Sequence, residues 1–449
     1  MTIPKAHVFV LGALTRSPRT LSHAKYLARN GWNVTISGYV NSSEPVPDTN
    51  GLRILSIPHY HEITNHIFPS ILSSLLKFII IFMLLSWHLI RHCRSNVILL
   101  QNPPAVPTLL IFYCFVTLTG KRLIIDWHNY GYTIMELNTR RNSIVARIYR
   151  LLEVGFASCF LSKNDNIRHI CVSKALKDDL LKHAIQATVF YDKPAEEFKP
   201  CHHSAAHKLF SRLQSIYPNF ADPAGSCRRT RFTEITALPA GHGGSSPQWR
   251  RDRPALVVSS CSWTPDDDFN LVLDALEKYD VVASGKDAML PYMLLVVTGR
   301  GPLKDAYARQ IRAKNWTNVE VLMPWLEWAD YTMLLGCADL AISVHRSSSG
   351  LDLPMKVVDF LGAGVPVLAL SYPTLDELLA DGEYGNHFTD SRQLFTLLTQ
   401  LLRTDDRSVT IGSSQLASYR NTLSAHNEKA IGAQPYWEQV VLPIFYMKA

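Results

Sequence analysis

The chain has 449 residues, which is too long for a single hydrophobic core and predicts two or three domains. Hydrophobic residues make up 47% of the sequence and charged residues 18%, and this balance excludes an intrinsically disordered protein. The net charge of +7 favours anionic partners such as nucleotide diphosphates and acidic lipid head groups. Because the sequence has no zinc-finger or RNA-binding signature, we expect no nucleic-acid partner.

In the first part of the chain, short apolar strands alternate with helical stretches, a pattern typical of a parallel sheet with crossover helices. The expected strands are His7–Leu11, Asn33–Ser37, Arg53–Ile57, Asn96–Leu100, Arg122–Ile125 and His169–Val172. Helices are predicted over Pro18–Arg29 and Arg140–Phe160, and over Lys174–Leu181 with Ser173 as the N-cap. These elements predict a first Rossmann-like, membrane-associated lobe over residues 1–190.

The most apolar stretch is Ile67–Ile90, in which Lys77 is the only charged residue. Its 24 residues would just span a bilayer, which needs about 20. We expect the segment to lie in or on a membrane, with a buried helix as the alternative. A true span is disfavoured, because the strands before and after the segment must stay on the same side of the membrane. The apolar run Thr108–Leu118 is too short to span.

The composition changes after the first lobe. Residues 201–253 are rich in glycine and proline and contain two basic clusters, Arg228–Arg231 and Arg250–Arg253. Apart from a possible helix over Ala206–Tyr217, this composition predicts a loop, and we expect a linker or insertion over residues 191–253. The basic clusters are interpreted as a solvated loop, with contact to an anionic surface as the alternative.

A second alternating unit is predicted over residues 254–416. Its expected strands are Ala255–Ser259, Tyr292–Val297, Val319–Leu322, Leu340–Ser343 and Val365–Leu370. The tail, residues 417–449, is predicted to be helical and to cross back to the first lobe. Two α/β lobes place a ligand cleft between them, near the carboxyl ends of their strands.

Two segments of the second unit are candidates for binding an anion. In the first, Gly299 and Gly301 lie between a strand and a helix, where backbone N–H groups can hold a phosphate, although any tight turn favours glycine. Arg300 between them is a candidate phosphate ligand or a solvated side chain. In the second, a loop with Ser349 and Gly350 precedes a helix that begins after a proline.

That helix carries Lys356 and Asp359 on one face. A cation in the first turn opposes the helix dipole, so its position needs a reason, and binding a diphosphate is such a reason. Asp359 is suited to accept both ribose hydroxyls, because a carboxylate takes two hydrogen bonds. The alternative is a surface ion pair between the two side chains.

The run from His345 to Val367 resembles the donor-nucleotide signature of glycosyltransferases of the GT-B fold. In this resemblance Asp359 takes the place of the glutamate that binds ribose. Asp352 stands near the first glutamate of the signature, which contacts the donor sugar. The spacing of the two acids is one residue shorter than usual.

Four segments in combination narrow the resemblance. They are Gln101–Pro104, Leu123–Tyr132, Ser259–Phe269 and Ser349–Asp359. From about residue 6 to 440, apart from the linker, the chain is similar to the chitobiosyldiphosphodolichol β-mannosyltransferase family. Two features depart from that family: we expect no N-terminal membrane anchor in this chain, whereas family members usually carry one, and Ala13 stands where the family usually has an aspartate.

The resemblance implies an α/β protein of the GT-B fold, with two Rossmann-like lobes facing a cleft. It also implies inverting transfer of the first β-1,4-linked mannose from GDP-mannose to dolichyl-diphosphate chitobiose. The implied place is the cytosolic face of the endoplasmic reticulum membrane, with that membrane surface and other mannosyltransferases of the pathway as partners. No tightly bound cofactor is implied, and a divalent cation is a candidate stimulator only.

Two pairs of residues in the first lobe are candidates for the reaction itself. His128 and Asp126 lie just past a strand, and an inverting transfer needs a base to take the proton of the attacking hydroxyl. His128 is the first choice and Asp126 the second; a histidine that only shapes the loop is the alternative. Arg16 and Arg19 are candidates for holding the acceptor diphosphate, against a surface role.

Three further residues of the second lobe are donor candidates. Ser262 and Thr264 are placed to contact the donor phosphate, although Thr264 followed by a proline is also a helix N-cap. The run Asp266–Asp268 is accordingly interpreted as helix capping, so no metal site is expected. Trp325 is placed to contact the base, with core packing as the alternative.

Two other functions remain open from sequence. A retaining transferase that adds an α-linked mannose or another sugar shares the same donor lobe. A catalytically silent homologue is the other alternative, and Ala13 is the feature that favours it.

Overall fold

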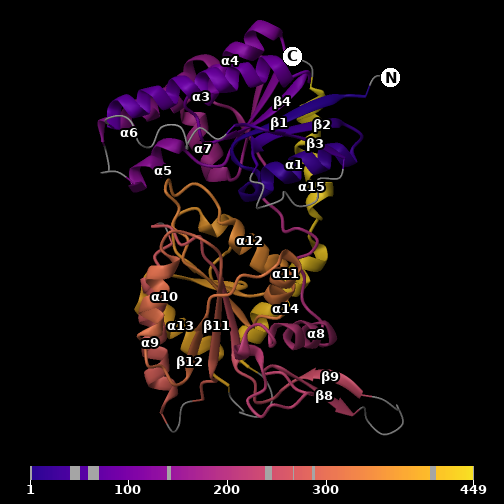
Figure 1. Ribbon diagram of the computed structural model, residues 1–449, viewed down its shortest axis with the longest axis vertical. Helices are drawn as coiled ribbons and strands as arrows, with labels where there is room; N and C mark the ends of the chain where they lie inside the picture. The colour runs from indigo at the N-terminus through magenta and orange to yellow at the C-terminus, as the bar shows by residue number, and fades with distance from the viewer. Residues whose placement is uncertain are drawn as a thin grey trace. The chain divides into compact units, whose positions relative to one another are not determined.

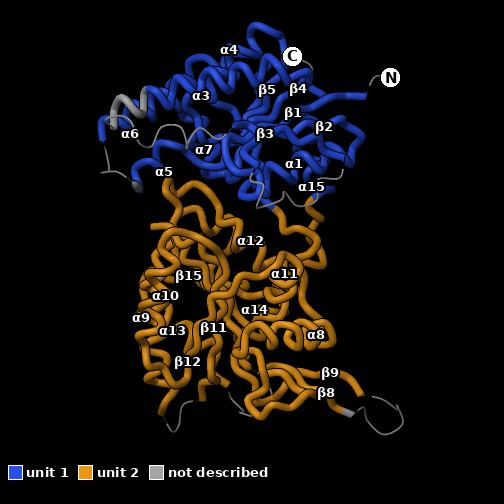
Figure 2. The backbone as a smooth tube through the Cα atoms, in the orientation of Figure 1, with its two compact units in different colours: residues 1–192, 434–449 blue, residues 193–433 orange. Residues whose placement is uncertain are grey.

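The computed structural model describes residues 3–40, 51–58, 70–138, 143–237, 245–265, 267–285, 289–404 and 411–447. The chain divides into two compact units (Figure 2). Unit 1 comprises residues 1–192 and 434–449, and unit 2 comprises residues 193–433. Each unit is built on its own parallel sheet.

Unit 1 contains a seven-stranded parallel sheet in the order β3-β2-β1-β4-β5-β6-β7. Its strands are β1 Lys5–Ala13, β2 Asn33–Tyr39, β3 Leu52–Ser56, β4 Val97–Asn102, β5 Arg122–Trp127, β6 Ile167–Cys171 and β7 Ala187–Val189. Its helices are α1 Pro18–Arg29, α3 Ser70–His92, α4 Thr108–Thr119, α5 Gly131–Asn138, α6 Ile144–Arg150, α7 Lys174–Lys182, α15 Ala433–Val440 and α16 Leu442–Tyr446. Every strand predicted for the first lobe is present, and the short β7 was not predicted.

Helices cover both faces of this sheet (Figure 1). On one face, Val8 and Val10 of β1 pack with α1 and with Trp437 of α15. On the other face, Phe9 contacts Phe112 of α4 and His88 of α3. Because both faces are covered, the central strands β4 and β5 have continuous apolar runs, as the sequence pattern required.

Helix α3 occupies the apolar stretch that the sequence places at a membrane. Residues 59–69 lie outside the described part, so the start of that stretch is not covered. One side of α3 is buried through Leu85 and Leu89, whereas Met83, Trp87 and Ile90 on the other side are 58–78% exposed. Within the described residues, no helix combines the length and the apolar character that crossing a bilayer requires.

Unit 2 contains a six-stranded parallel sheet in the order β12-β11-β10-β13-β14-β15. Its strands are β10 Ala255–Ser260, β11 Met293–Thr298, β12 Val319–Leu322, β13 Leu340–Ser343, β14 Val367–Leu370 and β15 Gly385–Phe388, and β8 Thr233–Ala237 pairs with β9 Ser245–Trp249 in a separate hairpin. Its helices are α8 His203–Leu213, α9 Asn270–Ala283, α10 Lys304–Arg312, α11 Trp328–Gly336, α12 Met355–Gly362, α13 Ser391–Leu402 and α14 Ser414–Lys429. All five strands predicted here are present.

The segment predicted as a linker is instead part of unit 2. Phe198, Phe210 and Phe232 are buried in one apolar core with Phe360 of α12. The composition misled because its glycines and prolines occupy the turns around α8 and the β8–β9 hairpin, while the aromatic side chains between them pack inward. Residues 238–244, which include the most glycine-rich part, lie outside the described residues.

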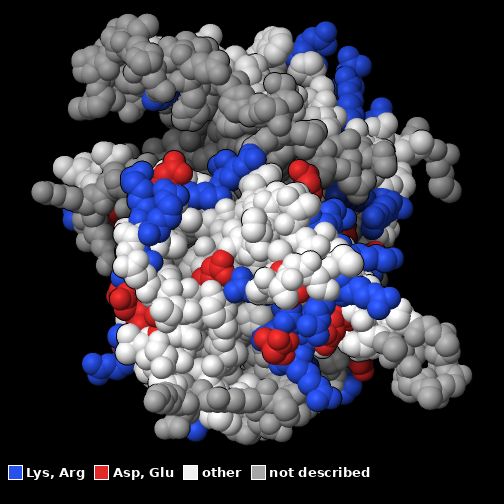
Figure 3. Space-filling model, turned by 60° about the horizontal axis from the view of Figure 1, so that its bottom comes forward, with Lys and Arg blue, Asp and Glu red and all other residues white. Residues whose placement is uncertain are grey.

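The basic clusters of that segment are largely paired inside the protein. Arg250 binds Asp222 at 2.8 Å, Arg253 binds Asp339 at 2.6 Å, and Arg229 binds Glu234 at 2.5 Å. On the face drawn in Figure 3, Lys and Arg side chains lie beside Asp and Glu side chains. Neither a purely solvated loop nor a free anion-binding surface describes these arginines.

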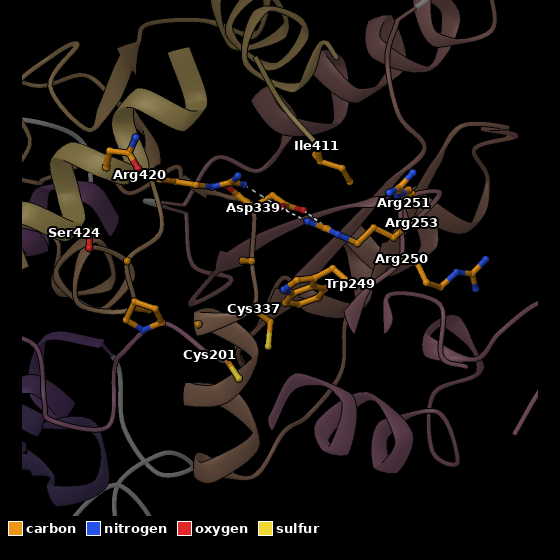
Figure 4. A pocket seen from close by; sticks show the side chains of 16 residues that line it. Cys201, Trp249, Arg250, Arg251, Arg253, Cys337, Asp339, Ile411, Arg420 and Ser424 are labelled. Atoms are coloured by element: carbon orange, nitrogen blue, oxygen red, sulfur yellow. Dashed lines mark hydrogen bonds and ion pairs between the residues drawn. The ribbon is translucent and has the colours of Figure 1, made fainter. Parts of the chain in front are cut away.

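A cavity of about 470 Å³ lies where several of these side chains meet, at the amino ends of the unit 2 strands. Figure 4 shows Arg253 and Arg420 directed at Asp339 from opposite sides. The Asp339 carboxylate is buried, takes both arginines at 2.6–2.9 Å and accepts from Leu256 N at 2.9 Å. Asp339 therefore fastens the start of β10 to α14.

We predict that Asp339→Ala lowers the free energy of unfolding by about 3–5 kcal/mol, because it leaves a mostly buried guanidinium without its counterion. Asp252→Ala is the matched control, because the Asp252 side chain is 73% exposed and its partner Arg250 keeps Asp222. That variant should lose about 1 kcal/mol or less. Urea unfolding followed by tryptophan fluorescence measures both, and equal losses would contradict the assignment.

Candidate active site

Unit 1 gathers three side chains around the carboxylate of Asp126, near the end of β5. The carboxylate is fully buried. It accepts hydrogen bonds from Arg19 Nε at 2.8 Å and Nη2 at 3.0 Å, from His23 Nε2 at 3.1 Å and from His128 Nε2 at 2.9 Å. A buried charge requires such pairing, and here the donors come from α1 and from the residues after β5.

These contacts bear on the roles predicted for Asp126 and His128. Burial would raise the pKa of Asp126, but Arg19, His128 and the hydrogen bonds hold it well below its usual value. An ionised carboxylate only accepts, so the proton of His128 lies on Nε2 and leaves Nδ1 able to take a proton. The His128 side chain is 22% exposed. This geometry favours His128 as the base and Asp126 as the group that orients it.

His23 belongs to the same network and was not predicted. Trp437 Nε1–H donates to His23 Nδ1 at 2.7 Å, which leaves the His23 proton on Nε2, directed at Asp126. Burial lowers the pKa of His23, so the ring stays neutral. The one signal in the sequence was the spacing of four residues between Arg19 and His23, which places both on one face of α1.

The two arginines predicted for the acceptor diphosphate differ in their surroundings. Arg19 is 3% exposed, and its guanidinium binds Asp126, Asp192 at 2.8 Å and the Phe190 carbonyl at 2.9 Å. All of its nitrogens are used inside unit 1, so the structure does not support the predicted contact with acceptor. Arg16, in the 3₁₀ turn before α1, is exposed and remains a candidate. Ala13 ends β1 just before that turn.

A second buried acid, Glu153, was missed by the sequence analysis. It accepts from Gly131 N at 2.9 Å, from Tyr132 N at 3.1 Å and from Asn102 Nδ2 at 3.1 Å. Burial raises the pKa of Glu153 to about 7, against these three hydrogen bonds, which lower it. Glu153 thereby joins the segments 101–104 and 123–132, the two that carry the family resemblance in unit 1.

The donor candidates of unit 2 gather at the carboxyl edge of its sheet, after β10, β11, β12 and β13. Glycine is required at both positions after β11, because the backbone of the loop after β10 lies too close for a side chain. A β-carbon on Gly299 would lie 1.9 Å from the Cys261 carbonyl oxygen, and one on Gly301 would lie 1.8 Å from that of Ser262. Gly299 also has a φ of +124°. The loop that carries Ser262 and Thr264 is thus packed directly against the glycine turn.

Arg300 and Trp325 form a second contact at this edge. The Arg300 guanidinium lies 3.4 Å from the centre of the Trp325 ring, and Trp325 is 50% exposed. Half exposure excludes the core-packing alternative for Trp325. The stacked pair presents an aromatic surface and a cation side by side, which suits a nucleotide base and a phosphate.

Lys356, in the first turn of α12, is held by Asp267. Its Nζ lies 3.0 Å from Asp267 Oδ2, which also accepts from Ser262 N at 2.6 Å. Burial would raise the pKa of Asp267, but Lys356 and the hydrogen bonds lower it. The alternative of an ion pair between Lys356 and Asp359 is wrong, because the partner is Asp267.

The capping roles predicted for Thr264 and Asp267 are also wrong, whereas Asp268 accepts from Asn270 N at 3.3 Å at the start of α9. Helix α9 begins at Asn270, not after Thr264, and its N-cap position is Phe269 without a side-chain hydrogen bond. Asp267 is instead buried, and it forms a short bridge with His345. Asp266 lies outside the described residues. Asp267 is a site residue that local sequence could not reveal, because its partner Lys356 lies 89 positions away.

The loop between β13 and α12 is closed by its own hydrogen bonds. Asp352 accepts from Ser347 Oγ and lies 3.4 Å from His345 Nε2, while Ser347 Oγ accepts from Gly350 N at 2.8 Å. Ser349 Oγ accepts from Leu351 N at 3.0 Å. Asp359 lies half-buried on α12, near enough to Tyr331 to contribute to the raised pKa of that phenol. The predicted donor residues therefore share one edge of one sheet.

Comparison with known proteins bears directly on this arrangement. The family described as "Glycosyl transferase-like" matches residues 287–434. Human chitobiosyldiphosphodolichol beta-mannosyltransferase is 36% identical over 97% of this chain and 91% of its own length. The UDP-glycosyltransferase TURAN of Arabidopsis thaliana is 36% identical over 89% of both chains.

The chain belongs to the chitobiosyldiphosphodolichol beta-mannosyltransferase family. The predicted membership and the predicted enzyme class, a hexosyltransferase, are confirmed. The crystal structure of Anabaena Alr3699/HepE with UDP and glucose covers 99% of this chain with a TM-score of 0.63 and 13% identity. That likeness confirms the predicted GT-B fold.

The donor assignment yields one prediction. Lys356→Ala and Asp359→Ala should each weaken GDP binding by about ten- to a hundredfold, because each removes a charge-assisted hydrogen bond. Calorimetry measures the affinity, and circular dichroism checks that the Lys356 variant, which leaves Asp267 unpaired, is folded. Lys314→Ala is the control, because Lys314 pairs with Glu277 away from the donor candidates. Unchanged GDP affinity in both site variants would refute the assignment.

The Asp126 network yields a second prediction. Trp437→Phe keeps an aromatic ring but removes the hydrogen bond to His23, so it should lower the transfer rate by about fivefold, the equivalent of one ordinary hydrogen bond. Trp32→Phe is the matched control in the same core, since Trp32 donates to the hydroxyl of Tyr446 instead. Equal rates for the two variants would show that Trp437 acts only by packing.

Proposed function

We propose that this protein transfers mannose from GDP-mannose to dolichyl-diphosphate-linked chitobiose, forming the first β-1,4-linked mannose with inversion. The observation that carries the proposal is the extent of the similarity to the human enzyme of that name, which covers 97% of this chain and so includes both units. A similarity confined to unit 2 would have supported only the use of a nucleotide-sugar donor and not the acceptor, because many transferases share that lobe.

In the proposed reaction His128 Nδ1 takes the proton of the attacking sugar hydroxyl. The Asp126 carboxylate fixes the ring through Nε2 and stabilises the imidazolium that forms. Arg19 and His23 keep that carboxylate in place and are positioning residues. Asp126 itself is a poor base, because its low pKa and its four hydrogen bonds oppose protonation.

The donor is proposed to bind at the carboxyl edge of the unit 2 sheet. Lys356 and Arg300 supply positive charge for the diphosphate, on which negative charge develops as the sugar leaves. Asp359 holds the ribose hydroxyls, and Trp325 offers its exposed ring to the base. The glycine turn contributes backbone N–H groups. Gly350, Asp352 and the serines near them shape the sugar pocket.

The proposed setting is the cytosolic face of the endoplasmic reticulum membrane. A dolichyl chain lies in a bilayer, so the enzyme must approach a membrane surface to reach its acceptor. The exposed apolar side of α3 in unit 1 is suited to this contact. Other mannosyltransferases that act on the same lipid-linked sugar are the proposed neighbours there, and a divalent cation is proposed only as a stimulator.

The name of the Arabidopsis relative indicates a UDP-linked donor, so donor choice needs its own test. Purified protein is incubated with a phytanyl-diphosphate chitobiose acceptor and either GDP-mannose, UDP-glucose or UDP-N-acetylglucosamine. We expect a product from GDP-mannose alone, with the β anomer identified by NMR. His128→Ala should lower the rate by about 10²–10⁴ and leave GDP affinity unchanged, whereas Asp126→Asn should give a milder loss.

Each alternative has its own signature in this experiment. An α-linked product would show a retaining transferase, and a product from a UDP-sugar would reassign the donor. No product from any donor, with GDP still bound, would show a silent homologue. If Asp126→Asn abolishes turnover while His128→Ala keeps most of it, the roles of the two residues are reversed.

A further inference from the structure

A cavity of about 260 Å³ lies at the amino edge of the unit 1 sheet, where the strands begin. The Asp126 network lies near the end of β5, at the opposite edge of this parallel sheet. Four cationic side chains line the cavity: Lys5 from the start of β1, Arg53 from β3, Arg91 from the last turn of α3 and Arg94 just after it. Thr35 and Ser95 add polar groups to the lining.

The strand register explains why these groups converge. Thr35 and Arg53 are direct partners on neighbouring parallel strands, so their side chains point to the same face of the sheet. Lys5 lies on that face too, because it is two residues from His7 and four from Phe9 on β1, and side chains at this spacing point to one face. His7 and Phe9 contact α3 and α4 there. The end of α3 closes the cavity from above the sheet.

The positive charge of this cavity is not balanced by the described part of the protein. No carboxylate lines it, and none of the four cations makes an ion pair with a described residue. Lys121, which donates to the Ser95 carbonyl at 2.7 Å, adds a fifth cation beside it. The carboxyl end of α3 carries roughly half a negative charge, which is too little to neutralise four. An anion is suited to balance this charge.

The exposed apolar side of α3 leads directly into this cavity. Met83, Trp87 and Ile90 are exposed by 65%, 58% and 78% and follow one side of the helix. The Trp87 ring lies 5.8 Å from the ring of His92, which is part of the cavity lining. Tryptophan at the junction of an apolar stripe and a cationic cluster is typical of a surface that meets lipid head groups.

We propose that the cavity binds the phosphate of an anionic phospholipid while the apolar side of α3 lies in the outer part of the bilayer. The proposal rests on the membrane contact of α3 in the proposed function and adds a head-group site to it. The volume supports a head group, because it is below the roughly 300–1,000 Å³ of sites that hold a whole small molecule. Four cations within one cavity attract an anionic phosphate, and the polar Thr35 and Ser95 are suited to donate hydrogen bonds to it.

The test is binding of the full chain to vesicles in a flotation assay. One set of vesicles is phosphatidylcholine alone, and the other contains phosphatidic acid as well. Arg53→Gln with Arg94→Gln should weaken binding to the anionic vesicles by about fivefold per arginine, or about 25-fold in all, and leave binding to phosphatidylcholine unchanged. The control is Lys177→Gln with Lys208→Gln, which removes the same charge from exposed positions on α7 and α8.

Three results would overturn the head-group site. They are an equal effect of the control pair, no effect of the arginine pair, and displacement from the vesicles by inorganic phosphate at the concentration of the lipid phosphate, which would mean a soluble ligand. Circular dichroism checks the fold of each variant.

Two further measurements separate the site from the proposed function. Trp87→Ser with Ile90→Ser should release the protein from both kinds of vesicle, and wild-type binding by that variant would refute the membrane contact itself. The arginine pair should keep the wild-type rate on a phytanyl acceptor in detergent. A comparable loss of that rate would place the cavity in the transfer reaction instead.

Discussion

The burial of one negative charge organises much of unit 1. Asp126 has no exposed surface, and a carboxylate in that position is tolerated only if donors surround it. Meeting this demand brings together α1, the end of β5 and, through His23, helix α15. His128 is the side chain whose ring nitrogen Nδ1 stays able to take a proton. A rigid acceptor for Nε2 fixes both the tautomer and the direction of that nitrogen, which is what a positioned base requires.

In unit 2 a buried carboxylate also holds a basic side chain, which is a lysine instead of a histidine. Asp267 is buried at the carboxyl edge of its sheet and holds Lys356, as Asp126 holds His128. In both units the acid itself is withdrawn from solvent, and the basic partner is the more exposed group, to which we assign a ligand. The mostly buried Asp339 has a different purpose, because both of its partners are arginines that tie elements together at the other edge of the sheet. Within unit 2, location relative to the strand ends separates the donor candidates from the fastening groups.

The sequence was sufficient wherever the signal is local. Strands such as Ala255–Ser260 are short apolar runs between turns, and α1 begins at a proline, so their positions follow from pattern alone. The donor candidates could be proposed because they lie in short local motifs, such as the glycine turn at Gly299–Gly301 and the loop and helix Ser349–Asp359. His23, Glu153, Asp267 and Trp437 were missed because each acts through a partner far along the chain, and a single sequence carries no record of such pairs. The role given to Arg19 failed for the same reason, since nothing local shows that Asp126 and Asp192 consume its hydrogen bonds. The glycine-rich stretch after residue 200 misled in another way, because composition reports turns and not the phenylalanines packed between them.

The position of Trp437 has a consequence for how the protein forms. Unit 1 is assembled from residues 1–192 and from 434 onward, and the whole of unit 2 lies between these parts in the chain. During synthesis the ribosome therefore releases the first sheet long before the helix that completes its core. Until α15 has been synthesised, His23 on α1 lacks its hydrogen bond from Trp437. Val8 and Leu27 also lack part of the apolar packing that buries them. The network around Asp126 therefore gains its hydrogen bond from Trp437 to His23 only after unit 2 has been synthesised, and the nascent chain must protect this half-finished lobe until then.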